Sequence, residues 1–175
     1  MPEKKPQLPP PRELLFSAAD RAKLPEESVR HPYNPASEVH GHTLSRRVGL
    51  KRVGVNLVRV PPGKESFVYH LHHAEEEWVW VLAGKGVADI GDESFDIGPG
   101  DFLGFPPSTH AHHIRNPGAA DLVYLCGGES REVEVADFPR LKRRVASWGR
   151  DGKLPHYHVY PMEAEIPFWP SEGGK

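Results

Sequence analysis

Cysteine is almost absent from this chain, which carries a single cysteine, Cys126, among its 175 residues. One cysteine excludes a disulfide bond within the chain and agrees with a reducing compartment. Cys126 ends the apolar run "DLVYLC", where no helix start or basic neighbour would lower the pKa of its thiol. We therefore expect an inert strand residue and not a nucleophile.

An excess of charge and long apolar runs are lacking as well. The 22 lysines and arginines balance 24 acidic residues, so the formal net charge is -2 and no overall field attracts nucleic acid or a membrane surface. No stretch approaches the roughly 20 apolar residues of a membrane-spanning helix. The first lysines are not followed by the apolar run of a secretory signal. We therefore expect a soluble, cytoplasmic protein that binds neither nucleic acid nor membrane.

Glycine and proline, in contrast, are plentiful, with 17 and 19 residues. They separate short apolar runs, a pattern that favours many strands joined by turns over a helical bundle. The predicted strands are "RVGVNLVRV", "SFVYHLH", "EEWVWVL", "GVADI", "SFDI", "DFLGF", "HAHHIR", "DLVYLC" and "REVEV". Their close and even spacing predicts an all-β fold, either an antiparallel sandwich or a barrel.

Composition divides the chain into three parts. Residues 1–44 are Pro-rich and polar and form a predicted N-terminal arm, with a short helix within "PRELLFSAADRAKL". Residues 45–136 carry the predicted strands and form the β-barrel. Residues 137–175 form a C-terminal extension, in which "RLKRRVASW" predicts a second short helix before a Pro-rich tail.

Titratable residues are concentrated in "FVYHLHHAEEEWVWVLAGKG", although this stretch otherwise has the pattern of β-strands. Alternate residues of a strand share a face, so His70 and His72 point the same way. A tight turn after His72 would fold the next strand back as a hairpin and place Glu77 beside both histidines. Two imidazoles and a carboxylate that converge form a metal site, which explains the charge, because buried charge is costly unless it is paired or coordinates a metal.

Two other histidine pairs have no such partner. His40 with His42, and His156 with His158, lie in Pro- and Gly-rich segments without a carboxylate at hairpin spacing. We interpret both pairs as solvated side chains of irregular arms.

Two spaced motifs resemble those of the cupin superfamily. They are Gly63-x6-His70-x-His72-x4-Glu77-x6-Gly84 and Pro107-x-Thr109-x2-His112-x3-Asn116. The resemblance covers roughly residues 50–128 and implies a double-stranded β-helix, or jelly roll, with one divalent metal in the barrel mouth. The metal ligands that it implies are His70, His72, Glu77 and His112.

The second motif departs from the family pattern at Thr109, where the family has a glycine that often permits positive φ. Gly63 also lies one residue further from the histidine pair than usual. His110 would share a face with His112 and is a rival fourth ligand, although the motif interval favours His112. His113 is expected to face away as an outward polar residue.

Glu75 and Glu76 compete with Glu77 as the carboxylate ligand. If Glu76 were the ligand, Trp78 and Trp80 would share its face and point into the barrel. Two indoles would crowd a small interior. Choosing Glu77 fills the interior with valines instead, in agreement with the motif interval.

If Glu77 points into the barrel, strand alternation places Trp78, Trp80 and Leu82 on the outer face. A row this large and apolar needs a cover, which we expect to be a terminal arm, a second subunit or an arm exchanged between subunits. A homodimer is the leading form, because two-fold dimers are the commonest oligomers.

The resemblance implies a metal-dependent enzyme of small molecules, of the dioxygenase or the sugar (phosphate) isomerase class. One divalent metal per chain, Fe, Mn, Ni, Co or Zn, would act as Lewis acid or oxygen-activating centre. One carboxylate and three imidazoles leave the site a charge of about +1, which attracts a small oxygen-rich anion or a sugar. His110 is the candidate proton shuttle. The alternative is a non-catalytic protein that binds a sugar or small acid through the same metal.

Overall fold

The computed structural model describes residues 8–149 and 156–164, and strands dominate both ranges. Helical segments are short: α1 (Ala18–Arg21) and the 3₁₀ turns Pro11–Leu14, Ser45–Val48, Pro139–Leu141 and Met162–Ala164. Among the described residues, no helix has the length and apolar character needed to cross a membrane. The predicted all-β class is confirmed.

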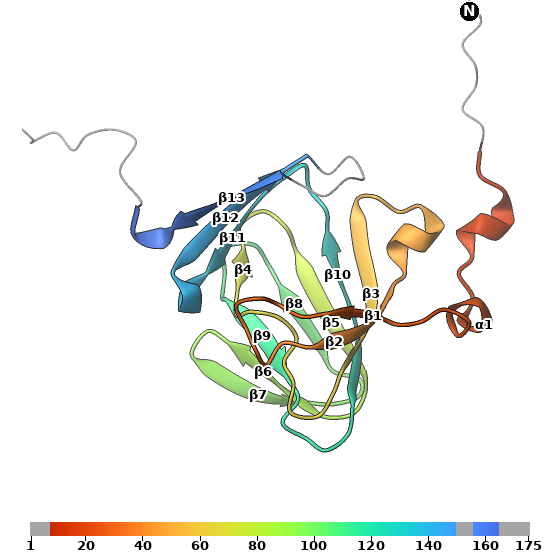
Figure 1. Cartoon of the computed structure of the whole chain (residues 1–175), viewed down its shortest axis with the longest axis horizontal. Helices are drawn as coiled ribbons and strands as arrows, with labels where there is room; N and C mark the ends of the chain where they lie inside the picture. The colour runs from red at the N-terminus through yellow and green to blue at the C-terminus, as the bar shows by residue number, and fades with distance from the viewer. Residues whose placement is uncertain (1–7, 150–155, 165–175) are drawn as a thin grey trace, which may run out of the picture.

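The strands form three antiparallel sheets (Figure 1). The six-stranded sheet has the order β1 (Glu27–Val29), β2 (Val39–Thr43), β3 (Val53–Val60), β10 (Leu122–Glu129), β5 (Glu77–Ala83) and β8 (Phe102–Phe105). The three-stranded sheet has the order β7 (Glu93–Ile97), β6 (Gly86–Ile90) and β9 (His112–Arg115). The four-stranded sheet has the order β13 (His156–Pro161), β12 (Arg143–Trp148), β11 (Val133–Phe138) and β4 (Leu71–His72).

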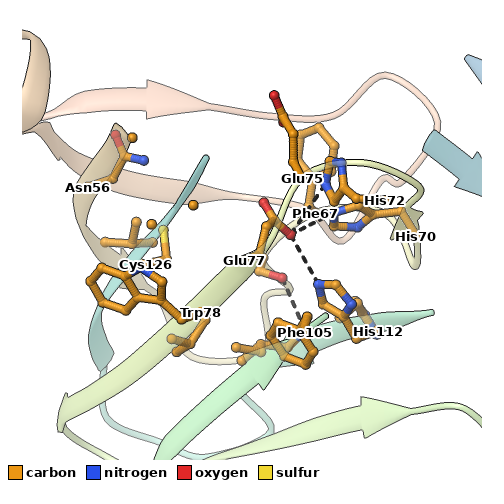
Figure 2. Close-up of a pocket in the computed structure, with 18 of the residues that line it drawn as sticks. Asn56, Phe67, His70, His72, Glu75, Glu77, Trp78, Phe105, His112 and Cys126 are labelled. Atoms are coloured by element: carbon orange, nitrogen blue, oxygen red, sulfur yellow. Dashed lines mark hydrogen bonds and ion pairs between the residues drawn. The ribbon is translucent and has the colours of Figure 1, made fainter. Parts of the chain in front are cut away.

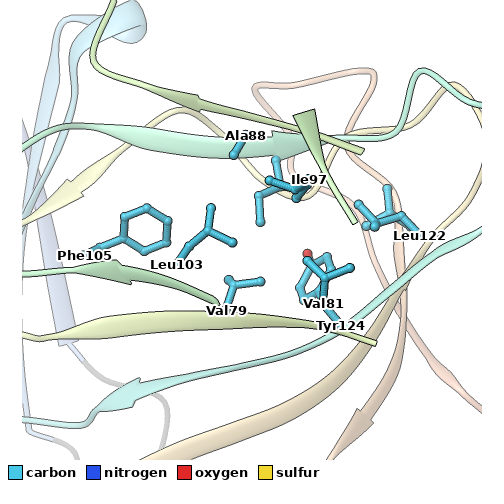
Figure 3. Packing of buried hydrophobic residues seen from close by; sticks show 10 residues of the cluster. Val79, Val81, Ala88, Ile97, Leu103, Phe105, Leu122 and Tyr124 are labelled. Atoms are coloured by element: carbon cyan, nitrogen blue, oxygen red, sulfur yellow. The ribbon is translucent and has the colours of Figure 1, made fainter. Parts of the chain in front are cut away.

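The hydrophobic core fills the jelly roll between the six-stranded and three-stranded sheets (Figure 3). Its buried members are Val60, Val79, Val81, Ala88, Ile97, Leu103, Phe105, Ile114, Leu122 and Tyr124. Strand alternation accounts for this selection, because β5 turns Val79 and Val81 inward and Trp80 outward. The predicted phase of β5, and with it the inward direction of Glu77, agrees with the structure.

Gly84 ends β5 in a conformation that only glycine adopts easily. Its φ is +78°, and a Cβ at this position would lie 2.1 Å from the carbonyl oxygen of Asp121. Both the left-handed backbone and the close approach of the chain therefore require glycine here. This motif glycine closes the turn between the two sheets that β5 and β6 belong to.

The predicted hairpin between the two histidine- and glutamate-bearing strands is wrong. β4 pairs with β11, through Leu71 opposite Asp137, whereas β5 pairs with β10 and β8. The two strands therefore belong to different sheets. Glu77 meets the histidines across the barrel mouth and not as a neighbour within one sheet.

The predicted helix in "RLKRRVASW" is also wrong. Residues 143–148 form β12, which pairs with β11 on one side and β13 on the other. Lys142 takes a left-handed conformation with φ of 51° and closes the turn between β11 and β12. Long-range strand pairing thus overrides the local helix pattern.

The histidine pairs of the arms lie in strands and not in irregular segments. His40 and His42 belong to β2, which extends the barrel sheet beside β3. His156 and His158 belong to β13, which is exposed along its length. The last residues of the Pro-rich tail lie outside the described ranges.

The outer face of β5 exposes two of the three residues of the predicted apolar row, whereas the third, Trp78, is half-buried against Gly127 of β10. Trp80 is 50% exposed and Leu82 is 44% exposed, and Phe102 of the edge strand β8 is 62% exposed beside them. The part of the chain that the structure describes does not bury these three side chains. Their cover by a terminal arm, a second subunit or an exchanged arm stays a prediction.

Candidate metal centre

Glu77 lies at the mouth of the barrel, on the inner face of the six-stranded sheet. It is the first residue of β5 and stands in register with Gly128 of β10 and Phe105 of β8. Gly128 leaves room for it, because a Cβ there would lie 3.1 Å from the Glu77 Cγ. The local backbone therefore fixes the direction of this carboxylate.

Three histidines direct their Nε2 atoms at one carboxylate oxygen, Glu77 Oε2 (Figure 2). The Nε2 to Oε2 distances are 3.5 Å for His70, 3.3 Å for His72 and 3.2 Å for His112. An isolated β-bridge between His70 and His112 joins the two histidine-bearing segments directly. The structure thus brings together all four side chains that the sequence predicts as ligands.

The orientation of these rings follows from what their Nδ1 atoms face. His70 Nδ1 lies 2.7 Å from the Val68 carbonyl oxygen, and His112 Nδ1 lies 3.4 Å from the His110 carbonyl oxygen. A carbonyl accepts but cannot donate, so Nδ1 of His70 carries a proton. Its Nε2 then presents a lone pair to the centre, as a metal ligand does.

Aromatic side chains pack against the same rings. Phe105 stacks on His112 with ring centroids 3.5 Å apart, and Phe138 stacks on His70 at 5.9 Å. Phe67 meets His70 edge to face. This packing restricts rotation of the imidazoles and keeps their nitrogens aimed at Glu77.

The charges of the four side chains are strongly coupled. Burial alone would raise the pKa of Glu77, but hydrogen bonds from His112, His70 and His72 outweigh it and lower that pKa. Burial lowers the pKa of His112, despite its contact with Glu77. Burial would also lower the pKa of His72, but the carboxylates around it raise that pKa above its usual value. A carboxylate is thus held ionised among imidazoles, one of which burial keeps neutral.

These residues fit a divalent cation. Imidazole nitrogens aimed at an anionic oxygen require protons or a cation between them, because their lone pairs would otherwise repel that oxygen. His70, Glu77 and His112 each offer a ligand atom, and these atoms all lie within 4.8 Å of one another. Three imidazole nitrogens and one carboxylate oxygen form a donor set of borderline softness, which suits Fe, Mn, Ni, Co or Zn.

The centre opens into a pocket of about 470 Å³. Its walls combine apolar side chains with a few polar groups, among them Asn56, Cys126 and Arg46. Cys126 is half-buried in β10, and desolvation of the thiol, together with the charge of Glu77, raises its pKa to about 12. The prediction of an inert strand cysteine agrees with this environment.

His110 does not join the centre. It is exposed and is not among the residues that line the pocket. Its ring lies 3.1 Å from where a Cβ on Gly91 would be. The expectation that it shares a face with His112 fails because β9 begins only at His112, so strand alternation does not extend back to His110.

The loop before β9 takes the left-handed turn that the motif predicts, but at a different residue. Ser108 has φ of 57°, whereas Thr109, which stands at the motif's glycine position, does not have positive φ. The neighbouring serine thus replaces the missing glycine. Its amide donates to the His72 carbonyl oxygen at 2.7 Å, which ties the loop to β4.

His113 is buried and not an outward polar residue. Its Nε2 lies 3.1 Å from Glu65 and its Nδ1 lies 3.2 Å from Asp89. Asp89 in turn pairs with Arg115 at 2.9 Å. The expected outward position is wrong because these partners, distant in the sequence, compensate the burial of a polar ring.

Sequence reasoning missed several polar residues near the centre. Glu134 of β11 lies 3.5 Å from His72 Nδ1, and Arg46 and Asn56 line the pocket. None of them belongs to a spaced motif. The one usable signal was a glutamate at an alternating position within the short predicted strand "REVEV".

Comparisons with known proteins agree with this geometry. A family model described as a cupin domain matches residues 56–128. A crystal structure of a putative sugar phosphate isomerase from Acidithiobacillus ferrooxidans is 35% identical, with a TM-score of 0.82, over 91% of this chain and 99% of that chain. A sugar phosphate isomerase from a cupin superfamily, from Silicibacter pomeroyi, is 25% identical with a TM-score of 0.66, over 72% of this chain and 78% of that chain.

A curated relative from Methanocaldococcus jannaschii, described as an uncharacterized protein, is 36% identical over 67 residues. The match covers 38% of this chain and 52% of the relative, so the chain spans about half the length of that protein.

Proposed function

Because the chain belongs to the cupin superfamily, we propose that it is a metal-dependent enzyme that isomerises a small sugar or sugar phosphate. The proposed ligands of one divalent cation are His70, His72, Glu77 and His112. The observation that carries this proposal is the convergence of three Nε2 atoms on a single carboxylate oxygen of Glu77 in the wall of a pocket.

The choice of an isomerase over a dioxygenase is supported by the solved structures described as sugar phosphate isomerases. A divalent cation held at this centre would supply Lewis-acid polarisation of a substrate carbonyl or hydroxyl oxygen. The protein side chains orient the substrate and exclude water. Phe67, Phe105 and Phe138 line the pocket around the histidines and provide apolar surface for this purpose.

Arg46 is suited to hold an anionic end of the substrate. Among the described residues that line the pocket, it alone carries a permanent positive charge. Its guanidinium donates to the Leu50 carbonyl oxygen at 2.5 Å and to Ser130 Oγ at 3.3 Å, and no carboxylate of the described ranges forms an ion pair with it. Two donors are thus occupied and the charge is not neutralised.

Arg46 and Glu77 line the same pocket, and their contacts with nearby residues of one segment relate their positions. Gly128 is the register partner of Glu77, and Ser130 follows two residues later. Two residues of strand span about 7 Å. A substrate whose oxygens face the centre could therefore reach Arg46 with a phosphate group at its other end.

We expect Arg46→Met to raise the KM for a phosphorylated sugar about tenfold or more, since a charged hydrogen bond contributes about 1.5–3 kcal/mol. The KM for the corresponding free sugar should stay unchanged. Arg47→Met is the matched control, because Arg47 pairs with Glu27 at 3.8 Å and is not among the pocket-lining residues. Equal effects of the two substitutions, or none, would rule out this role for Arg46.

The function itself is tested by loading the protein separately with Fe, Mn, Ni, Co and Zn. Each form is incubated with aldoses, ketoses and their phosphates, and interconversion is followed by NMR. Metal-dependent interconversion supports the isomerase. Consumption of oxygen would favour the dioxygenase class instead, and binding of a sugar without turnover by any form would replace the enzyme with a binding protein.

We also propose that the protein is a homodimer, with the face formed by Trp80, Leu82 and Phe102 in the interface. These side chains form one exposed apolar patch over β5 and β8, and large apolar patches mark protein contacts. Sedimentation should give the mass of two chains, and Trp80→Ser with Phe102→Ser should give the mass of one. A wild-type monomer at tens of micromolar would contradict this assembly.

A further inference from the structure

A second group of titratable side chains lies behind His72, on the side away from Glu77. Glu134 of β11 is 2% exposed and Glu75 is 4% exposed. One carboxylate oxygen of each lies within 4.8 Å of the other and of a ring nitrogen of His72. Buried carboxylates need a compensating partner, and the proposed centre uses neither of them.

Glu134 faces His72 most directly. Its Oε1 accepts from the backbone amides of His73 at 3.0 Å and Ala74 at 3.4 Å, and it lies 3.5 Å from His72 Nδ1. Within the described ranges no lysine or arginine forms an ion pair with Glu134, and His72 Nδ1 is buried without a hydrogen-bond partner. A buried donor and a buried acceptor thus face each other slightly beyond hydrogen-bond distance.

The other two histidines of the centre indicate how His72 and Glu134 interact. Nδ1 of His70 and of His112 each faces a backbone carbonyl oxygen, and each Nε2 faces Glu77. His72 repeats this arrangement, with its Nε2 3.3 Å from Glu77, but a carboxylate takes the place of the carbonyl. A carboxylate on the outer nitrogen fixes the tautomer and makes the imidazole a stronger ligand.

We propose that Glu134 is a positioning residue that accepts a hydrogen bond from the Nδ1–H of His72 and so leaves the Nε2 lone pair directed at the cation. The proposal rests on the metal centre of the proposed function and adds a residue that no motif marks. The backbone amides of His73 and Ala74 hold the carboxylate in place. A small rotation of the His72 ring completes the hydrogen bond.

His72, Glu75 and Glu134 also offer ligand atoms for a second cation. That assignment requires His72 to bind one cation through each nitrogen, and therefore to lose its remaining ring proton. A neutral imidazole keeps one proton. The proton on Nδ1 is the simpler occupant of the space between His72 and Glu134.

Glu134→Ala should weaken binding of Co(II), measured by titration, by about 10–100-fold, the usual effect of removing such a partner. Glu134→Gln keeps an acceptor oxygen and should lose less. Glu129→Gln is the control, because Glu129 also lines the pocket but pairs with Arg131 at 2.9 Å. Circular dichroism of each variant verifies the fold, and the near-isosteric glutamine variant keeps the test decisive if the alanine variant unfolds.

A second readout needs no metal and no substrate. Nitrogen-15 NMR of the imidazoles in the metal-free protein should show His72 protonated on Nδ1, and Glu134→Ala should shift this proton toward Nε2. Unchanged Co(II) affinity together with an unchanged His72 tautomer would overturn the positioning role. Two Co(II) ions per wild-type chain, one of them lost with Glu134, would overturn it in favour of a second cation site. If the Co(II) affinity and the His72 tautomer both change as expected but no sugar is turned over, only the isomerase proposal is overturned.

Discussion

Replacement of His112 by alanine is expected to weaken divalent metal binding by more than about 100-fold, which is the upper end for residues that touch a metal only through a ligand. His112 Nε2 lies 3.2 Å from Glu77 Oε2, and its ring is clamped by Phe105 at a centroid distance of 3.5 Å. His112 is the first residue of β9, and its side chain is buried. Titration with Co(II) or Mn(II) measures the change.

The matched control is His110→Ala, which removes a histidine from the same loop. His110 is exposed and its ring lies against Gly91, away from the pocket lining. Its removal should leave the affinity within about twofold, because distant surface substitutions change little. Loss of metal in the His110 variant with retention in the His112 variant would reverse the assignment of the fourth ligand.

Replacement of Leu122 by alanine is expected to lower the free energy of unfolding by about 2–5 kcal/mol, the range for large-to-small substitutions in cores. Leu122 is 0% exposed and packs against Gly86, where an added Cβ would lie 2.5 Å from its Cδ2. The contact closes the barrel between β10 and β6. Urea unfolding followed by tryptophan fluorescence measures the loss.

Leu50→Ala is the control for Leu122, because Leu50 is 48% exposed and such a change should stay within about 0.5 kcal/mol. The Leu122 variant should also keep its metal affinity. Leu122 lies six residues along β10 from Gly128, the register partner of Glu77, or about 20 Å of extended strand. A loss of stability below about 1 kcal/mol would contradict the assignment of Leu122 to the core.

Strand alternation made much of the centre predictable from the sequence. A period of two residues decides which side chains share a face, so the pattern alone assigns His70 with His72 to one face, and Glu77 with Val79 and Val81 to another. The same rule excludes Glu76, whose phase would bring two tryptophans into the barrel. These assignments need only local backbone geometry.

The way in which the strands pair could not be predicted by the same means. β4 pairs with β11, some sixty residues later, and not with β5. β12 forms a strand because β11 and β13 flank it, although its own residues suit a helix. Such pairings depend on long-range contacts that no local pattern contains.

The supporting residues were missed for a related reason. His113 is buried because Glu65, from the segment between β3 and β4, and Asp89, from β6, reach it. Glu134 faces His72 only after β11 has paired with β4. His110 was misplaced because β9 begins after it, at His112. A single polar residue carries no spacing signal, so its partner becomes visible only in the folded chain.

The central claim is that one divalent metal is held by His70, His72, Glu77 and His112. Elemental analysis of protein purified without chelator tests it most directly, with Glu77→Ala and His72→Ala purified in parallel. We predict close to one equivalent of Fe, Mn, Ni, Co or Zn per wild-type chain, and a small fraction of that in both variants. A metal-free wild type that takes up none of these ions on titration, or full occupancy in either variant, would contradict the account.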